Sequence, residues 1–195
     1  MDEAVPTQSP LSDLLDQLEG LSRQGRLIEA DDLRPFDTLL VGFESDFDLA
    51  AEVYFVNDVI EPFGDESDLE CVVAQILVRL PFVAEPRDTP EAVRFCNALS
   101  QLLTAGVLCC NERNGVIYFR ALLPMPDRTL PAGVLDSVLN TAEAVLEKSM
   151  DLVRSVSVGA ETFDNAIAIL AERGVRIPRM ESLHVPPANA AGGDN

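Results

Sequence analysis

Residues 89–156 constrain the fold more than any other part of this sequence, because they predict a helix, a hairpin and a second helix in direct succession. Thr89 is a suitable N-cap with Pro90 at the first helical position, and Gly106 is a suitable C-terminal stop. Between them, apolar residues recur at the three-and-four spacing of one helix face. These residues are Ala92, Phe95, Cys96, Leu99, Leu102 and Leu103.

A β-hairpin is predicted next, with strands at 107–111 and 116–122 that are rich in β-branched, aromatic and apolar residues. Asn114-Gly115 lies between them and can supply the two positive φ angles of a type I′ turn. Three prolines then break the pattern. After them, helical spacing returns in a long apolar stripe made by Val134, Leu135, Val138, Leu139, Ala142, Val145, Leu146 and Met150.

The part of the chain before residue 89 predicts one helix followed by three strands. The helix begins at Ser9-Pro10 and continues to about Gly25, with five leucines on one face. Strands are expected at 39–44 and 51–56, joined by 45–48. Residues 71–82 favour a third strand ended by Pro81, although a helix is an alternative there.

Length and hydrophobicity predict a single domain with polar ends. The chain has 195 residues, of which 47% are hydrophobic, which is enough to bury a substantial core. We expect a flexible N-terminus at 1–8, one domain at 9–182 with its core at 11–156 and a further helix at 161–173, and a disordered tail at 183–195. No apolar run is long enough to span a bilayer and no leader pattern appears, so a cytoplasmic location is expected.

Negative charge is concentrated in the first part of the sequence. Residues 1–70 hold 19 acidic residues and 3 arginines, a net charge of −16, whereas the whole chain has −19. Such a surface repels phosphate backbones and anionic membranes, so nucleic-acid and membrane partners are not expected. It would attract a basic segment of a partner protein. The alternative is that these carboxylates serve only solubility.

Catalytic and metal-binding motifs are missing from the sequence. The one histidine, His184, lies in the predicted tail, and no glycine-rich phosphate loop is present. The four cysteines, Cys71, Cys96, Cys109 and Cys110, lack metal-site spacing and are expected to be reduced thiols. Two acidic groups could gather oxygen ligands but lack the glycine and full spacing of a calcium loop: Glu44, Asp46, Asp48 and Glu52, and Asp65, Glu66, Asp68 and Glu70. We therefore expect no metal, no cofactor and no enzyme activity.

The order of elements and four short motifs resemble the YbjN-like family, within the type III secretion chaperone-like fold. The motifs are Gln-Ile-Leu-Val-Arg-Leu-Pro at 75–81, Phe-Cys-Asn at 95–97, Gly-Val-Ile-Tyr-Phe-Arg at 115–120, and Leu-Asp-Ser-Val-Leu at 135–139. The resemblance covers about residues 11–156. It implies an α+β sandwich in which helices pack on one face of a twisted antiparallel sheet, in the order α-β-β-β-α-β-β-α plus an appended C-terminal helix. It also implies a small acidic homodimer that binds or regulates other proteins.

Three residues are candidates for contact with a partner. Tyr118 and Arg120 share one face of the second hairpin strand, opposite the apolar residues that alternate with them. Asn97 is a polar residue among apolar neighbours, for which a structural hydrogen bond is favoured over a ligand contact. The function expected is a non-catalytic protein-binding module, chaperone-like or regulatory, whose partner has a basic or unfolded segment. Two alternatives remain, namely an assembly subunit that uses its sheet edge or third helix, and a carboxylate-based hydrolase.

Overall fold

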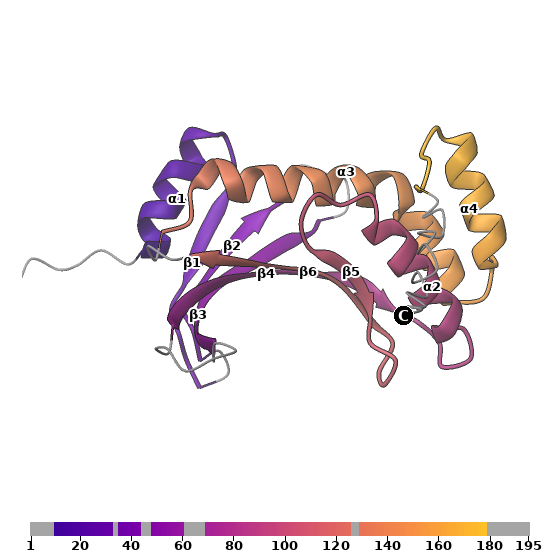
Figure 1. Cartoon of the computed structure of the whole chain (residues 1–195), viewed down its shortest axis with the longest axis horizontal. Helices are drawn as coiled ribbons and strands as arrows, with labels where there is room; N and C mark the ends of the chain where they lie inside the picture. The colour runs from indigo at the N-terminus through magenta and orange to yellow at the C-terminus, as the bar shows by residue number, and fades with distance from the viewer. Residues whose placement is uncertain (1–9, 33–34, 44–47, 61–68, 126–128, 179–195) are drawn as a thin grey trace, which may run out of the picture.

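The structure, a computed structural model, describes residues 10–32, 35–43, 48–60, 69–125 and 129–178, with backbone alone at 57–60 and 69–71. Figure 1 shows its helices and strands. In chain order these are α1 (Pro10–Gly20), β1 (Gly25–Ile28), β2 (Thr38–Gly42), β3 (Ala50–Ile60), β4 (Leu69–Val83), α2 (Thr89–Ser100), β5 (Val107–Cys110), β6 (Val116–Met125), α3 (Ala132–Ser157) and α4 (Phe163–Glu172). The fold is α+β, as the sequence predicts.

The six described strands form one antiparallel sheet in the order β1-β2-β3-β4-β6-β5. The sheet is curved, and α3 runs across one side of it from α1 to the pair α2 and α4 (Figure 1). Because side chains alternate along a strand, every second residue points toward these helices. The inward set is almost fully buried and comprises Leu39, Val41, Ala51, Val53, Ala74, Ile76, Val78, Leu108, Ile117, Phe119 and Ala121.

Each helix packs the stripe of apolar residues that its sequence repeats. Leu11, Leu14 and Leu18 of α1 are buried, as are Phe95 and Leu99 of α2. The longest helix, α3, buries a stripe along its whole length that includes Leu135, Leu139, Ala142, Leu146, Met150, Val153 and Val156. Full burial of one such side chain contributes roughly 1.5–3 kcal/mol, so this single core accounts for most of the favourable free energy of folding.

The first helix ends earlier than the sequence predicts, and a strand that was not predicted follows it. Ser22 has a φ of 65°, a left-handed conformation that a helix cannot continue through. The Arg23 amide then bonds back to the Leu18 carbonyl at 3.0 Å, which is a common way of closing a helix C-terminus. Gly25 therefore begins β1 instead of ending α1.

Arg23 is the main polar link between α1 and α3. Its side chain is 2% exposed, and it donates to Asp136 Oδ1 at 2.8 Å, to Glu143 Oε2 at 3.1 Å and to the Asn140 side-chain oxygen. Burial alone would lower the pKa of the guanidinium, but its hydrogen bonds to the two carboxylates outweigh burial and raise that pKa above its usual value. The cluster thus keeps a full positive charge beneath the end of α1.

The long strand β4 confirms the strand prediction for 71–82, but Pro81 does not end it. Residues Val72 to Arg79 pair in continuous register with β6, and the register shifts between Arg79 and Val83. Proline has no N–H to donate to a ladder, so it is tolerated at such an irregularity. The strand resumes its pairing at Val83 opposite Val116.

The hairpin between β5 and β6 forms, but its turn is not type I′. Such a turn requires positive φ at both central residues, whereas only Gly115 has one, at 70°. Its amide donates to the Asn111 carbonyl at 2.8 Å, closing a longer loop. A Cβ on Gly115 would lie 2.2 Å from the Ala84 carbonyl oxygen, and the Ala84 amide donates to the Gly115 carbonyl at 2.8 Å. The loop geometry is therefore set by docking of the hairpin on the end of β4.

Two helix boundaries also differ from their predictions. The N-cap position of α2 is Asp88, while the Thr89 hydroxyl donates to the Glu85 carbonyl at 3.0 Å. Gly106, predicted as the stop, lies in the turn before β5 with a φ of 80°, after the helix has ended at Ser100. Helix ends fray, so the sequence pattern alone does not fix the terminal residue of a helix.

The last helix, α4, is held at both ends by polar contacts. Glu91 accepts the Phe163 amide at 3.0 Å, and the Arg94 guanidinium lies 4.3 Å from the centre of the Phe163 ring. These hydrogen bonds, first that from the Phe163 amide and then that from Arg94, lower the pKa of Glu91. At the other end Arg173 makes two hydrogen bonds to Asp151, at 2.7 and 2.6 Å, which lower the pKa of that carboxyl.

Candidate functional site

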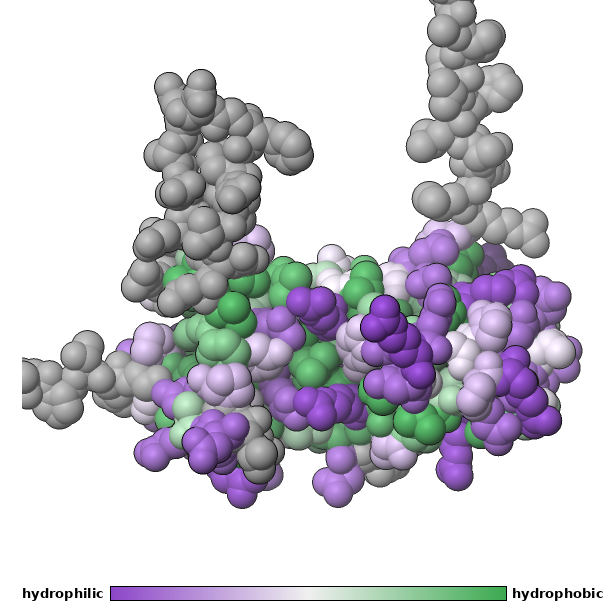
Figure 2. All heavy atoms as spheres, turned by 90° about the horizontal axis from the view of Figure 1, so that it is seen from below, coloured by the Kyte–Doolittle hydropathy of each residue, from purple (hydrophilic) through white to green (hydrophobic). Residues whose placement is uncertain are grey.

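The face of the sheet that points away from the helices carries the strongest candidate site. We call it the open face, because none of the described helices packs on it (Figure 1). It is made by the residues that alternate with the buried set: Arg26, Thr38, Leu40, Glu52, Tyr54, Val56, Val73, Gln75, Leu77, Arg79, Val107, Cys109, Tyr118, Arg120, Leu122 and Pro124. Figure 2 shows this side of the molecule, where apolar side chains lie among polar ones.

Two large apolar side chains on the open face are exposed to solvent. Leu122 of β6 is 49% exposed and Val107 of the edge strand β5 is 45% exposed. Val107 lies directly opposite Arg120 in the register, and Leu122 lies opposite Gln75. Exposed apolar groups next to arginine and tyrosine are typical of surfaces that bind other proteins.

A chain of hydrogen bonds orders the centre of the open face. The Gln75 amide donates to the Tyr54 hydroxyl, and Arg120 donates to the Gln75 side-chain oxygen at 3.2 Å. Beside this chain, Arg79 lies 3.5 Å from the Glu52 carboxylate. These contacts cross three neighbouring strands and fix the orientation of the polar groups before any partner arrives.

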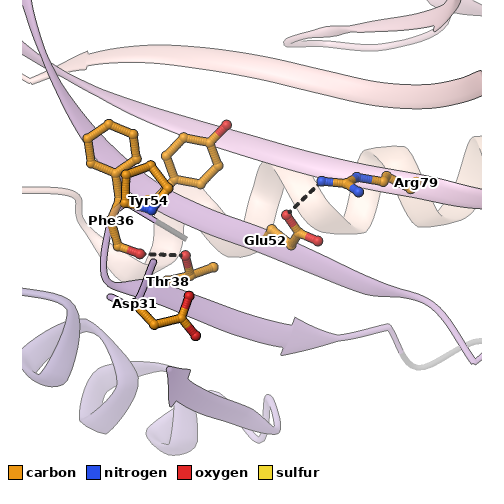
Figure 3. A pocket seen from close by; sticks show the side chains of 7 residues that line it. Asp31, Phe36, Thr38, Glu52, Tyr54 and Arg79 are labelled. Carbon is orange, nitrogen blue, oxygen red and sulfur yellow. Dashed lines mark hydrogen bonds and ion pairs between the residues drawn. The ribbon is translucent and has the colours of Figure 1, made fainter. Parts of the chain in front are cut away.

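A pocket of about 520 Å³ opens at the β2–β3–β4 end of this face (Figure 3). It is lined by Asp31, Pro35, Phe36, Thr38, Glu52, Tyr54 and Arg79. The rings of Phe36 and Tyr54 stack with centroids 5.8 Å apart, and the Thr38 hydroxyl donates to the Phe36 carbonyl at 3.0 Å. The lining has no histidine, serine or cysteine among its described residues, and the second of its two hydroxyl groups, that of Tyr54, accepts a hydrogen bond from Gln75. The lining thus combines two carboxylates, one arginine and two aromatic rings, groups that can bind both polar and apolar parts of a side chain.

The described cysteines have raised pKa values. Burial raises the pKa of Cys96 strongly. Burial also raises the pKa of Cys109 and Cys110, although a hydrogen bond with Tyr118 and the charge of Arg120 partly offset it at Cys109. Cys110 packs against the core and Cys109 lies on the open face, so the two adjacent thiols diverge as expected for neighbours on a strand. Protonated thiols are weak nucleophiles at neutral pH.

The edge of the sheet at β5 is closed by a side chain of α2. The Ser100 hydroxyl accepts the Leu108 amide at 2.8 Å and lies 3.1 Å from the Leu108 carbonyl oxygen. It also lies 2.9 Å from the Cys96 carbonyl. A strand that added to this edge would have to displace α2.

The three predicted contact residues do not form one site. Tyr118 and Arg120 both lie on the open face, as their alternation predicts. Asn97 is exposed on α2, on the helix side of the sheet, and no described residue hydrogen-bonds its side chain, so the favoured structural bond is not found. Sequence reasoning missed Leu122, which alternation along the strand could have placed next to Arg120, and Val107, whose place opposite Arg120 depends on the hairpin register.

Gln75 and Arg79 are further candidate site residues, which the sequence analysis did not select. They interrupt the apolar run of β4 four residues apart, a spacing that places both on the same face of a strand. Only the order of strands in the sheet shows that this is the face of Tyr118 and Arg120, because β4 pairs with β6.

The described residues include no cluster of three or more acidic, cysteine or histidine side chains placed to hold a metal ion. Of the two predicted acidic groups, Asp48 and Glu52 lie within the described residues. The others (Glu44, Asp46, Asp65, Glu66, Asp68 and Glu70) lie outside the described side chains, as does Cys71.

Comparison of the chain with protein-family models, curated proteins and solved structures gives no match. In the described part of the chain, none of the helices is both long enough and apolar enough for a membrane span. The resemblance to the YbjN-like family, the homodimer and the cytoplasmic location therefore stay predictions.

Proposed function

We propose that this chain is a non-catalytic protein-binding module, chaperone-like or regulatory, that holds a segment of a partner protein on its open face. The observation that carries the proposal is the pair of half-exposed apolar side chains, Leu122 and Val107, beside Arg120 and Tyr118. Arginine and tyrosine are the residue types that contribute most at protein interfaces, because they combine apolar area with directed hydrogen bonds.

The rest of the molecule supports use of this face. Helices α1, α2 and α3 pack on the other side of the sheet, and α4 packs on α2 and α3. At the β5 edge, an added strand would break the hydrogen bond from the Leu108 amide to the Ser100 hydroxyl. The polar groups of the open face are held in place by one another, which lowers the entropy lost when a partner binds. The adjoining pocket could receive one side chain of the bound segment.

The test is retention of partner proteins by matched variants. Leu122→Asp places a charge at the centre of the open face, whereas Val134→Asp places one at a 45% exposed apolar position on α3, on the helix side. Both sites are exposed, so we expect both variants to fold, as far-UV circular dichroism would verify. A partner that is held by the wild type and by Val134→Asp should be lost from Leu122→Asp. Equal retention by all three proteins would contradict the proposal.

A further inference from the structure

We propose that the partner segment bound on the open face is acidic and amphipathic, and that it docks on the half of this face built by β4, β6 and β5. This inference rests on the proposed function and specifies its ligand. We call this half of the face the arginine platform. It consists of Gln75, Leu77, Arg79, Val107, Tyr118, Arg120 and Leu122.

The charge of the arginine platform is opposite to that of the whole chain. The chain has a net charge of −19 with only 14 basic residues, yet two of them, Arg79 and Arg120, lie on this platform. Its described side chains include no carboxylate. Glu52 of the neighbouring strand β3 lies opposite Leu77 in the register and 3.5 Å from Arg79. A carboxylate of a partner would therefore meet a locally positive surface.

The two arginines are spaced for simultaneous contact. Arg79 is opposite Tyr118 in the register and Arg120 is opposite Leu77, so the arginines occupy diagonal positions on neighbouring strands. Such positions are about 7–8 Å apart at the Cα atoms. Two carboxylates at i and i+2 of an extended segment, or at i and i+4 of a helix, span a similar distance.

Apolar side chains surround this arginine pair. Leu77 is directly opposite Arg120 and two residues before Arg79 on β4. Val107 is opposite Arg120 on the next strand, β5. Leu122 follows Arg120 on the same face of β6 and is 49% exposed. A segment that alternates acidic and apolar residues would contact the arginines and the apolar side chains at the same time. A purely acidic segment would leave Leu77 and Leu122 exposed to water.

Arg120 and Arg79 keep donors available for such a ligand. A guanidinium has five N–H donors, and the structure gives Arg120 one hydrogen bond, to Gln75. Arg79 is 63% exposed and its ion pair with Glu52 is long. Binding can therefore proceed without breaking a buried interaction.

The arrangement of charge argues against a second copy of this chain as the occupant. Two arginine platforms facing each other across a two-fold axis would bring four guanidinium groups together without a carboxylate of the platform between them. Like charges in one interface are unfavourable. The acidic partner also differs from the basic partner expected from the N-terminal sequence, because the platform is built from residues between 75 and 122 and includes two arginines.

Two fluorescein-labelled peptides test the inference by fluorescence anisotropy against the full chain. They share one pattern of leucine and phenylalanine, and carry either glutamate or lysine at every other position. We expect the glutamate peptide to bind and the lysine peptide not to bind. We also expect its binding to weaken between about 0.02 M and about 0.2 M NaCl, since the Debye length falls over this range.

Charge-reversal variants locate the site. Arg79→Glu with Arg120→Glu should weaken binding of the glutamate peptide by roughly tenfold or more. The control is Arg154→Glu with Arg176→Glu, which changes the net charge by the same amount at two exposed positions off the open face and should change binding by less than about threefold.

Each contrary outcome overturns this inference. Preference for the lysine peptide would overturn it, as would equal weakening by both double variants, which would indicate a general charge effect. Sedimentation showing a dimer that Leu122→Asp dissociates would assign the open face to a second copy. If the glutamate peptide does not bind but the Leu122→Asp variant still loses a natural partner, the inference of an acidic segment is wrong and the proposed function stands. If the glutamate peptide does not bind and the Leu122→Asp variant retains the same partners as the wild type, the proposed function is wrong as well.

Discussion

Replacement of Arg23 by methionine is the most direct test of how α1 is fixed to the sandwich. Methionine keeps most of the length and volume of the arginine stem but removes the charge and all the N–H donors. In the wild type these donors reach Asp136, Asn140 and Glu143, all on α3. The variant therefore leaves two carboxylates in a partly buried site without the positive charge that they share.

The size of the effect follows from the exposure of the two acids. Removing one partner of a buried ion pair destabilises a protein by about 3–5 kcal/mol, because the remaining charge has lost its compensation. The Glu143 side chain is 13% exposed and its Oε1 atom is buried without a described partner, but Asp136 is 27% exposed and can regain water. We therefore expect a loss near the lower limit, about 3 kcal/mol.

Equilibrium urea unfolding measures this loss. The chain has no tryptophan, so far-UV circular dichroism is the suitable signal. The midpoint should fall while the slope m stays unchanged, since the same surface is exposed on unfolding. Arg113→Met, at an exposed arginine in the β5–β6 loop, is the control and should lie within about 0.5 kcal/mol of the wild type.

A second variant separates charge from packing. Adding Glu143→Met and Asp136→Asn to Arg23→Met removes the uncompensated charges, and it should recover at least half of the loss, because apolar replacements of buried ion pairs are often neutral. A loss below about 1 kcal/mol for Arg23→Met, or no recovery in the triple variant, would refute the claim that this cluster stabilises the α1–α3 contact.

Three further predictions concern an edge, a turn and a pH-dependent contact. Ser100→Ala should cost about 1–2 kcal/mol in urea unfolding and speed hydrogen exchange of the β5 amide that it caps; an unchanged exchange rate would show that the edge is protected otherwise. Gly115→Ala should destabilise by more than about 2 kcal/mol, because it combines positive φ with a backbone clash, whereas Gly133→Ala in open space on α3 should stabilise by up to about 1 kcal/mol; equal melting temperatures for the two variants would contradict this. The lowered pKa of Asp151 in the folded state means that its contact with Arg173 stabilises the fold above the unfolded pKa of about 3.9 and is lost as pH falls through the lower folded value. Asp151→Asn should therefore reduce the fall in the free energy of unfolding below about pH 4, by less than about 1 kcal/mol because the pair is exposed. The same pH dependence in the variant and the wild type would contradict a stabilising role for this contact.

The regular elements with a strong repeat could be predicted from the sequence. The stripe of α3 and the leucines of α1 have a helical period that no other structure buries as well, and the alternating residues of β6 have the period of a half-buried strand. The short strand β1 could not be predicted, because four residues carry too little pattern and its place depends on pairing with β2. The buried Arg23 is likewise held by contacts with residues more than a hundred positions away.

The candidate site was predictable only in part. Tyr118 and Arg120 could be assigned to one face because alternation along a strand is a local property. Asn97 shows the limit of such reasoning, because the helical pattern does not say whether a polar residue beside the stripe is bonded or exposed. The exposure of Leu122 depends on the tertiary structure, because none of the described helices packs on the open face.

The sequence by itself determined the type of the longer helices and strands, and which side of each would be apolar, because these properties repeat within a few residues. The tertiary structure alone decided that β4 lies beside β6, and so brought Arg79 and Gln75 next to Arg120 and Leu122. Pairing between strands some forty residues apart depends on the whole core and cannot be read from either strand alone. That pairing creates a basic and apolar surface on a strongly acidic chain.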